Sequence, residues 1–516
     1  MLTALIAIPA LGAVLVALLP RGADALVKWT AFAVSLAAAA LTLVMAILYD
    51  TDKPDRFAQT YWWIKQFGVH WAVNVDGISL VLIGLSVILV PVVVLASWSD
   101  ADRSGGVGGA DGVEGPSPKR SVKTYFALLL SLEAMIIGVF AATDLFLFYV
   151  FFEAMLVPVY FIIGSYGGPQ RSYAAVKFLL YSLFGGLLML AAVIALYVVS
   201  HTNSFLISDL AGAHLEVGTA RWLFLGFFIA FAIKAPLVPF HTWLPDAAGQ
   251  SPAGALVLVV GVLDKVGTYG MLRFCLELFP EASRWFTPVV LTLSVIGIVY
   301  GAVLAIGQVD LKRLIAYTSI SHFGFIALGI FAMTSQGQSG STLYMVNHGF
   351  STGALFLIAG FMITRRGSAR IDAYGGVQKV APLLAGTFLI AGLSGLGLPG
   401  LSSFVSEFLV LVGTFTRYKV PAVIGTVGII LAAVYILWMY QRTMNGPTVE
   451  KVDGMPDLSG REIVAVAPVI ALIVALGFFP KPVLDVINPS VQQTLSRVQM
   501  QDPQPTVATV QEGPRP

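Results

Sequence analysis

Charged side chains are scarce in this chain of 516 residues. Only 11% of the residues are Asp, Glu, Lys or Arg and 57% are hydrophobic, whereas a soluble domain carries about 25% charged residues. The formal net charge of +2 is small, so nothing indicates nucleic-acid binding. This composition excludes a soluble globular protein and indicates a chain that lies within a lipid bilayer.

Cysteine is almost absent as well, since Cys275 is the only one in the sequence. One thiol cannot form an internal disulfide, and a thiolate-ligated iron–sulfur cluster would need about four. The histidines give no clustered metal site, and the sequence has no phosphate-binding glycine loop. We therefore expect no cofactor and no metal in this chain, and we disfavour an enzyme that is catalytic on its own. Haem ligation by His322 and His348 stays open, and an absorbance spectrum would decide it.

Long apolar runs recur through the whole sequence. A membrane-spanning helix needs about 20 such residues, so the predicted fold class is an all-α polytopic membrane protein with about fourteen transmembrane helices. The expected spans lie near residues 2–19, 26–48, 77–98, 123–142, 145–164, 173–200, 221–245, 252–275, 285–306, 311–333, 341–363, 382–416, 421–441 and 461–480. The first run has no basic segment before it and no small-residue cleavage site after it, so we interpret it as a retained helix rather than a signal peptide.

The distribution of basic residues predicts the orientation. Lys and Arg are more frequent in the alternate loops that hold Arg21, Lys119, Arg120 and Lys312, which places those loops in the cytoplasm. An even number of spans then puts both termini on the non-cytoplasmic side. The Gly-rich loop 104–118 is expected to be a flexible insert, and residues 491–516 are expected to form a disordered tail.

An internal repeat is visible in the sequence itself. Asp144-Leu145 opens one expected helix and Asp310-Leu311 opens another, and Phe184 and Phe350 follow at the same offset. The two copies are five helices apart, so they are inverted relative to the membrane, as in transporters whose sites lie at broken helices near mid-bilayer. The predicted organisation consists of a three-helix N-terminal segment 1–122, a first five-helix repeat 123–275, a second inverted five-helix repeat 285–441, and a C-terminal helix 461–480.

Two spans are expected to be broken. One contains Lys234-Ala-Pro236-Leu-Val-Pro239, and the span five helices later contains Gly395-Leu-Gly-Leu-Pro399-Gly400. Proline removes a backbone hydrogen-bond donor and glycine adds backbone freedom, so we expect each helix to be interrupted at these residues. Such an interruption is tolerated inside a membrane where the backbone lines a cavity.

Four charges lie deep inside these spans, and they are the leading candidates for function: Glu153, Lys234, Lys265 and Glu407. A charge at the bilayer centre costs at least about 2.5 to 3.5 kcal/mol, so each needs a partner, water or a proton. Groups held between desolvation and mutual attraction are suited to exchange protons. The alternative is a purely structural role, in which the four charges form ion pairs that hold helices together. Buried ion pairs, however, seldom stabilise a protein more than apolar packing does.

Histidines could bridge the distance between these charges. Imidazole passes protons near physiological pH, and we nominate His322 and His348 in the second repeat, with His241 after the first break as a weaker candidate. A buried histidine is as often a hydrogen-bonded structural residue. His70 is expected to be solvated in a loop.

Several long motifs resemble a known family. They are DLFLFYVFFEAMLVP, KAPLVPFHTWLPDA, LDKVGTYGMLRF, LKRLIAYTSISHFGFIALGI and GLGLPGLSSFVSEFLVL. Across roughly residues 75 to 445 the chain is similar to the antiporter-type membrane subunits of respiratory complex I, and in particular to the M type, the counterpart of the fourth mitochondrial NADH dehydrogenase chain.

The resemblance implies roles for individual residues. It implies that Glu153 pairs with Lys234 at the broken helix, that Lys265 is the central lysine, and that Glu407 is the terminal acid. Related L-type and N-type chains, and Mrp antiporter chains that resemble the N type, generally have lysine at that last position, so glutamate there favours the M type. Asp264 departs from the family, which usually has an apolar residue there.

The resemblance also implies a function in an assembly. The chain is expected to be a proton-translocating subunit of NADH:quinone oxidoreductase in the bacterial inner membrane, beside L-type and N-type chains, with FMN, iron–sulfur clusters and quinone held by partner subunits. The alternatives are a subunit of an Mrp-type Na⁺/H⁺ antiporter and a passive scaffold.

Overall fold

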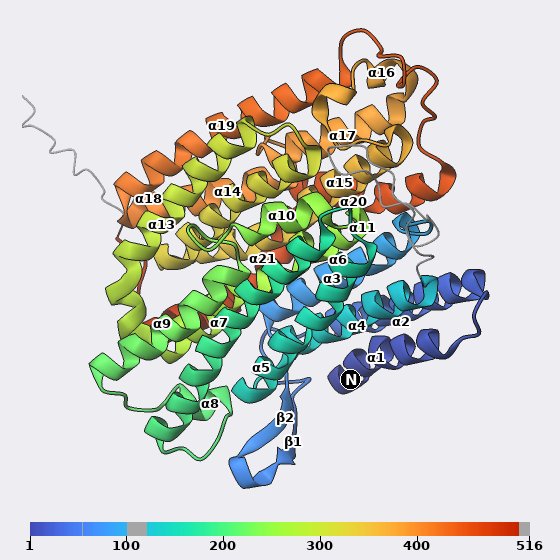
Figure 1. Cartoon of the computed structure of the whole chain (residues 1–516). Coiled ribbons are helices and arrows are strands. Elements are labelled where there is room, and N and C mark those ends of the chain that lie inside the picture. Colours follow the sequence, from blue (N-terminus) through green and yellow to red (C-terminus); the bar gives the residue numbers. More distant parts are fainter. Residues whose placement is uncertain (54, 101–120, 505–516) are drawn as a thin grey trace, which may run out of the picture.

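The computed structural model describes residues 1–53, 55–100 and 121–504, and most of its helices lie side by side along a common direction (Figure 1). Among the described residues, twelve helices are long and apolar enough to cross a membrane, and two apolar helices, Leu2–Leu18 and Pro382–Gly395, are shorter. The predicted all-α polytopic class is confirmed, while the length criterion for a span is met by twelve of the expected segments. The Gly-rich loop 104–118 lies outside the described residues.

The N-terminal segment contains three helices and a β-hairpin. The helices are α1 (Leu2–Leu18), α2 (Asp24–Leu48) and α3 (Gly77–Ala96). The hairpin, β1 (Gln59–Ile64) and β2 (Val69–Val73), projects from one end of the helices (Figure 1). It also corrects the prediction for His70, which is 8% exposed and lies with its ring 4.0 Å from that of Trp62. Trp62 faces His70 across the antiparallel register and covers it.

The helices of the first expected repeat surround its break. They are α4 (Val122–Ala141), α5 (Leu145–Ala154), α6 (Leu156–Tyr166), α7 (Arg171–Ser200), the short α8 (Ile207–Leu210), α9 (Val217–Lys234) and α10 (Trp243–Gln250). The next span is not a regular α-helix: it consists of α11 (Ala253–Leu258), the π-helix η2 (Val259–Leu263), α12 (Lys265–Gly270) and the π-helix η3 (Met271–Leu276).

The second half of the chain contains the second expected repeat and the helix that follows it. Its elements are α13 (Pro280–Ile306), α14 (Leu311–Ala332), α15 (Ser335–Arg366), α16 (Val377–Val380), α17 (Pro382–Gly395), α18 (Ser402–Arg417), α19 (Lys419–Met444) and α20 (Gly460–Phe478). α14 and α15 are almost wholly buried, so the polar residues of the second half lie at the centre of the molecule.

Two aspartates at matching positions support the repeat. The Asp144 side chain accepts hydrogen bonds from the first turn of α5, and that of Asp310 does the same for α14, as expected of an N-cap. Each aspartate also forms an isolated antiparallel bridge, Asp144 with Leu206 and Asp310 with Arg370. The same cap and bridge therefore recur where the sequence repeat predicts them.

The predicted tail from residue 491 is wrong in its first part. Residues Lys481–Val498 form helix α21, which packs across the ends of α3 and α15. The buried positions Ile487, Val491 and Leu495 follow each other at intervals of four residues, the spacing of an amphipathic helix. The polar residues between them lower the mean hydropathy, which is why the segment does not resemble a span. Residues 505–516 lie outside the described part.

Candidate functional site: a row of buried polar residues between two broken helices

Both predicted breaks are present, and they share one geometry. At the first, the Leu237 amide donates to the Ala232 carbonyl at 2.9 Å; at the second, the Leu398 amide donates to the Leu393 carbonyl at 3.0 Å. Both bonds reach back five residues, from a residue beyond the helix end to the last turn, as the 6→1 bond of a Schellman C-cap does, so each helix ends at its break.

At the first break, α9 ends in the interior of the protein. α9 ends at Lys234, whose side chain is 1% exposed, and the indole Nε1 of Trp243 donates to the Ile233 carbonyl at 2.9 Å. This bond satisfies one of the carbonyls that the interrupted helix leaves free. The break thus holds a lysine at a helix end in the interior, with the backbone around it hydrogen-bonded.

The second break depends on glycine. Gly397 and Gly400 have φ values of +75° and +91°, a backbone region that side chains disfavour. A Cβ at Gly397 would also collide with the Glu407 carboxylate. The glycine therefore allows the broken backbone to lie directly against the acid.

Glu153 and Lys234 are neighbours but not a direct ion pair. They interact electrostatically, yet in the part of the chain that the structure describes no contact within 4.0 Å joins the two side chains. The Glu153 carboxylate lies against Gly186, where a Cβ would collide with it. The ammonium of Lys234 lies 4.5 Å from the centre of the Phe152 ring, which is a cation–π distance. The implied pairing is therefore a through-space interaction here.

Lys265 faces the second half of the molecule. Its Nζ donates to the Val260 carbonyl at 2.5 Å and lies 2.6 Å from Nδ1 of His348, and both side chains are fully buried. This contact joins the eighth predicted span to α15, and so connects the two expected repeats.

The nominated histidines lie next to each other and lead towards Glu407. The rings of His348 and His322 are 5.3 Å apart, and the ring of Tyr344 is 5.6 Å from that of His322. The Tyr344 hydroxyl donates to Oε1 of Glu407. The residues Lys265, His348, His322, Tyr344 and Glu407 thus form a row of successive neighbours, called the polar row below.

Tyr344 was not among the predicted site residues. It precedes His348 by four residues on α15, so the two share a helix face, and that spacing could have identified it. A tyrosine in an apolar helix is, however, a weaker indication of function than a charged residue.

His241 lies outside the polar row. Its ring is 5.4 Å from that of Tyr300, and it is 4% exposed. Near it, Asp246 accepts hydrogen bonds from Lys177 at 2.6 Å and Arg313 at 2.8 Å, so this region is an ion cluster that joins α7, α10 and α14. The structure does not bring His241 together with the other nominated residues.

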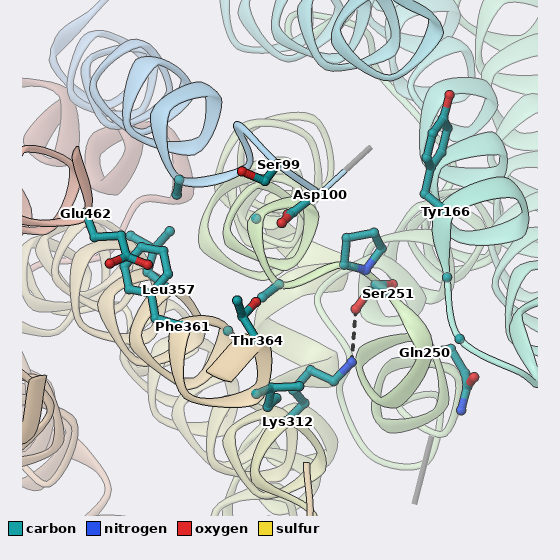
Figure 2. Close-up of a pocket in the computed structure, with 18 of the residues that line it drawn as sticks. Ser99, Asp100, Tyr166, Gln250, Ser251, Lys312, Leu357, Phe361, Thr364 and Glu462 are labelled. Atoms are coloured by element: carbon teal, nitrogen blue, oxygen red, sulfur yellow. Dashed lines mark hydrogen bonds between the residues drawn. The ribbon is translucent and has the colours of Figure 1, made fainter. Parts of the chain in front are cut away.

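A separate cavity of about 90 Å³ opens at the ends of α3, α6 and α15. Figure 2 shows Lys312 beside it, donating to the Ser251 carbonyl at 3.0 Å, with Asp100 and Glu462 further along the wall. None of the four predicted charges lines this cavity. It is polar and has room for several water molecules, but it is not part of the polar row.

A membrane fold with two broken helices and buried ionisable groups between them is typical of membrane subunits of the antiporter type. Residues 142–434 match the family described as the NADH:quinone oxidoreductase/Mrp antiporter transmembrane region, and the chain belongs to that family. The predicted family is confirmed.

Individual relatives indicate which type of subunit within this family the chain resembles. NADH-quinone oxidoreductase subunit M of Mycobacterium tuberculosis is 52% identical, over 97% of this chain and 95% of that one. A chain of respiratory complex I from Thermus thermophilus is 32% identical with a TM-score of 0.86, over 96% of this chain and all of that chain. A chain of the Mrp complex from Dietzia is 21% identical with a TM-score of 0.83, over 97% and 99%, and shows the shared fold alone. The predicted M type agrees with the first of these.

Proposed function

We propose that this chain is the M-type, proton-translocating membrane-arm subunit of NADH:quinone oxidoreductase. The observation that carries the proposal is the polar row, which leads from Lys265 in the first half of the chain to Glu407 beside the second break. Groups that exchange protons must lie within hydrogen-bond reach of each other or of a shared water, and the polar row meets that requirement at its two ends.

The residues of the polar row have separate roles in this proposal. The ammonium of Lys265 gives a proton to Nδ1 of His348 at 2.6 Å. An imidazole that receives a proton at one nitrogen can release another from the second nitrogen, so His348 can pass the charge on towards His322. Tyr344 donates to Glu407, and Glu407 is the terminal acceptor. The ring separations of His348 from His322 and of His322 from Tyr344 require a water molecule to carry the proton across each of these steps.

Lys234 and Glu153 would control this transfer from the first break. Glu153 stabilises the charged form of Lys234 by electrostatic attraction. A change in the strength of this attraction would alter how strongly Lys234 repels a proton on Lys265. Quinone reduction in neighbouring subunits would supply that change, since this chain is proposed to hold no redox group. FMN, iron–sulfur clusters and quinone would belong to the partners, among them the L-type and N-type chains.

The proposed location is the bacterial inner membrane, with both termini on the non-cytoplasmic side. The basic loops predict this orientation. It places the cavity in Figure 2 at the cytoplasmic ends of the helices, because the loop with Arg21 and the start of α4 lie at that end: Lys123 donates to the Ala17 and Leu19 carbonyls.

The alternative is an Mrp-type antiporter subunit. The Mrp chain shares the fold at 21% identity, but the acid at position 407, where Mrp-type chains are expected to have lysine, favours the M type. Sodium-dependent exchange by the isolated chain would support the alternative.

The decisive experiment replaces Lys234 or Glu407 by alanine in the assembled complex. We expect NADH-driven proton pumping in membrane vesicles to fall by about 10²-fold or more, the usual effect of losing a proton-transfer group, with normal assembly. Lys419→Ala, at an exposed lysine, is the matched control and should pump normally. Unchanged pumping in both variants would reject the relay, and loss of assembly in both would favour a scaffold.

A further inference from the structure

Asp264 is a buried acid that the polar row does not include. Its side chain is completely buried, and within the described residues neither carboxylate oxygen has a hydrogen-bond partner. Burying a carboxylate without such bonds is costly. The acid must therefore interact with charges nearby or hold a proton.

The packing of α12 shows which way Asp264 faces. Gly267 lies one turn further on, and a Cβ there would collide with the Phe231 carbonyl and the Ala235 amide at the end of α9. Residues three apart share a helix face, so Asp264 is directed towards the same end of α9, where Lys234 lies. The electrostatic partners of Asp264 are accordingly Lys265 and Lys234.

Asp264 directly follows the π-helix η2, and Lys265 is the next residue along the chain. The Asp264 amide donates to the Val259 carbonyl at 3.1 Å, a bond that reaches back five residues and widens the turn. Lys265 turns to Val260 and His348 on the α15 side, while Asp264 faces α9. The two consecutive residues thus face the two halves of the molecule.

We infer that Asp264 is a further proton-carrying residue, which takes a proton from Lys234 and gives it to Lys265. In the first step the Lys234 ammonium becomes an amine and the Asp264 carboxylate becomes a carboxylic acid. In the second, the acid becomes a carboxylate again and the neutral Lys265 becomes an ammonium. The inference rests on the proposed function and adds a proton transfer to the electrostatic control that Lys234 exerts there, since within the described residues no hydrogen bond joins Lys234 to Lys265.

The geometry favours an acid between the two lysines for a simple reason. Two ammonium groups repel each other, and a carboxylate between them both lowers that repulsion and offers a lone pair to which a proton can move. An apolar residue at position 264 would leave only water for the transfer. The chain should therefore move protons faster with Asp264 than without it.

The test uses Asp264→Asn, Asp264→Leu and Asp264→Glu in the assembled complex. We expect the Asn and Leu variants to assemble normally and to pump protons about tenfold more slowly with NADH, with a larger solvent deuterium isotope effect because the transfer becomes rate-limiting. The Glu variant should restore the rate and the wild-type isotope effect. Thr268→Val removes another buried polar atom from α12 and is the control, with unchanged pumping.

Each result separates the inference from the proposed function. Normal pumping by both Asp264→Asn and Asp264→Leu, with Lys234→Ala inactive beside them, overturns the role of Asp264 and keeps the relay. A Glu variant as slow as the Asn variant means that Asp264 is only structural and also overturns the inference. Normal pumping by Lys234→Ala as well rejects the proposed function itself.

Discussion

Tyr344 occupies the step between the imidazoles and the terminal acid. Its hydroxyl donates to Glu407 while its ring lies beside His322, so Tyr344→Phe keeps the ring and removes only the donor. We expect proton pumping to fall roughly tenfold, because a hydrogen bond to a charged group contributes about 1.5 to 3 kcal/mol. The measurement is the initial rate of NADH-driven acidification in membrane vesicles.

The control for this substitution is Tyr374→Phe. The hydroxyl of Tyr374 donates to the Ser368 carbonyl in a loop, at 2.6 Å, and has no contact with the polar row. Its loss should leave pumping unchanged. Equal rates for the two variants would mean that water, rather than Tyr344, reaches Glu407.

The charged members of the site were predictable because charge is rare in apolar helices. Lys265 and Glu407 stand out in their own segments, and the structure places both in the polar row. Tyr344 did not stand out, since its hydroxyl becomes significant only when α15 packs against α18. The prediction that His70 is solvated was wrong for the same reason: its burial depends on Trp62, which covers it from the opposite strand of a β-hairpin.

The break in the twelfth predicted span is sensitive to a single methyl group. Gly397 combines a positive φ with close contact to the Glu407 carboxylate. A non-glycine residue in that conformation costs about 1 to 2 kcal/mol, and the added Cβ must also displace the acid. We expect Gly397→Ala to lower both the thermal stability of the complex and its pumping rate.

Gly386 provides a matched comparison on α17, the helix that ends just before Gly397. It lies in the regular part of α17, where a Cβ would meet no atom within 4 Å, and alanine favours a helix more than glycine does. Gly386→Ala should leave stability and pumping equal to the wild type or slightly higher. The explanation fails if Gly397→Ala behaves in the same way.

Elements that depend on local chemistry were predictable, and elements that depend on packing were not. Proline and glycine identified both breaks. The π-helices beside Lys265 have no local sequence signal, because they arise where α12 packs against α9 and α15. α21 was missed because its apolar residues form a narrow stripe, which becomes stabilising only against the ends of α3 and α15.

At the scale of the whole molecule, a charge network joins three distant segments at the end of α3 opposite the cavity. Arg273 forms ion pairs with Asp76, at the start of α3, and with Glu277; Glu277 in turn pairs with Arg497 on α21. Burial alone would raise the pKa of Asp76, but the Arg273 guanidinium and hydrogen bonds from Ser79 hold it below its usual value. The stabilisation from Asp76 is therefore present above its unfolded-state pKa and is lost as the pH falls through its folded-state pKa.

Removing Arg273 should weaken this end of the molecule as a whole. Arg273→Ala leaves two largely buried carboxylates, with side chains 12% and 2% exposed, without their shared cation. Breaking a buried pair in this way costs about 3 to 5 kcal/mol, so we expect the assembled complex to dissociate at a lower temperature, as followed by native electrophoresis after heating. Arg370→Ala is the control, because its pair with Asp372 is 40% and 51% exposed and exposed pairs contribute only about 0 to 1 kcal/mol. If the two variants dissociate at the same temperature, the network does not hold α3, η3 and α21 together, and the apolar stripe of α21 must do so alone.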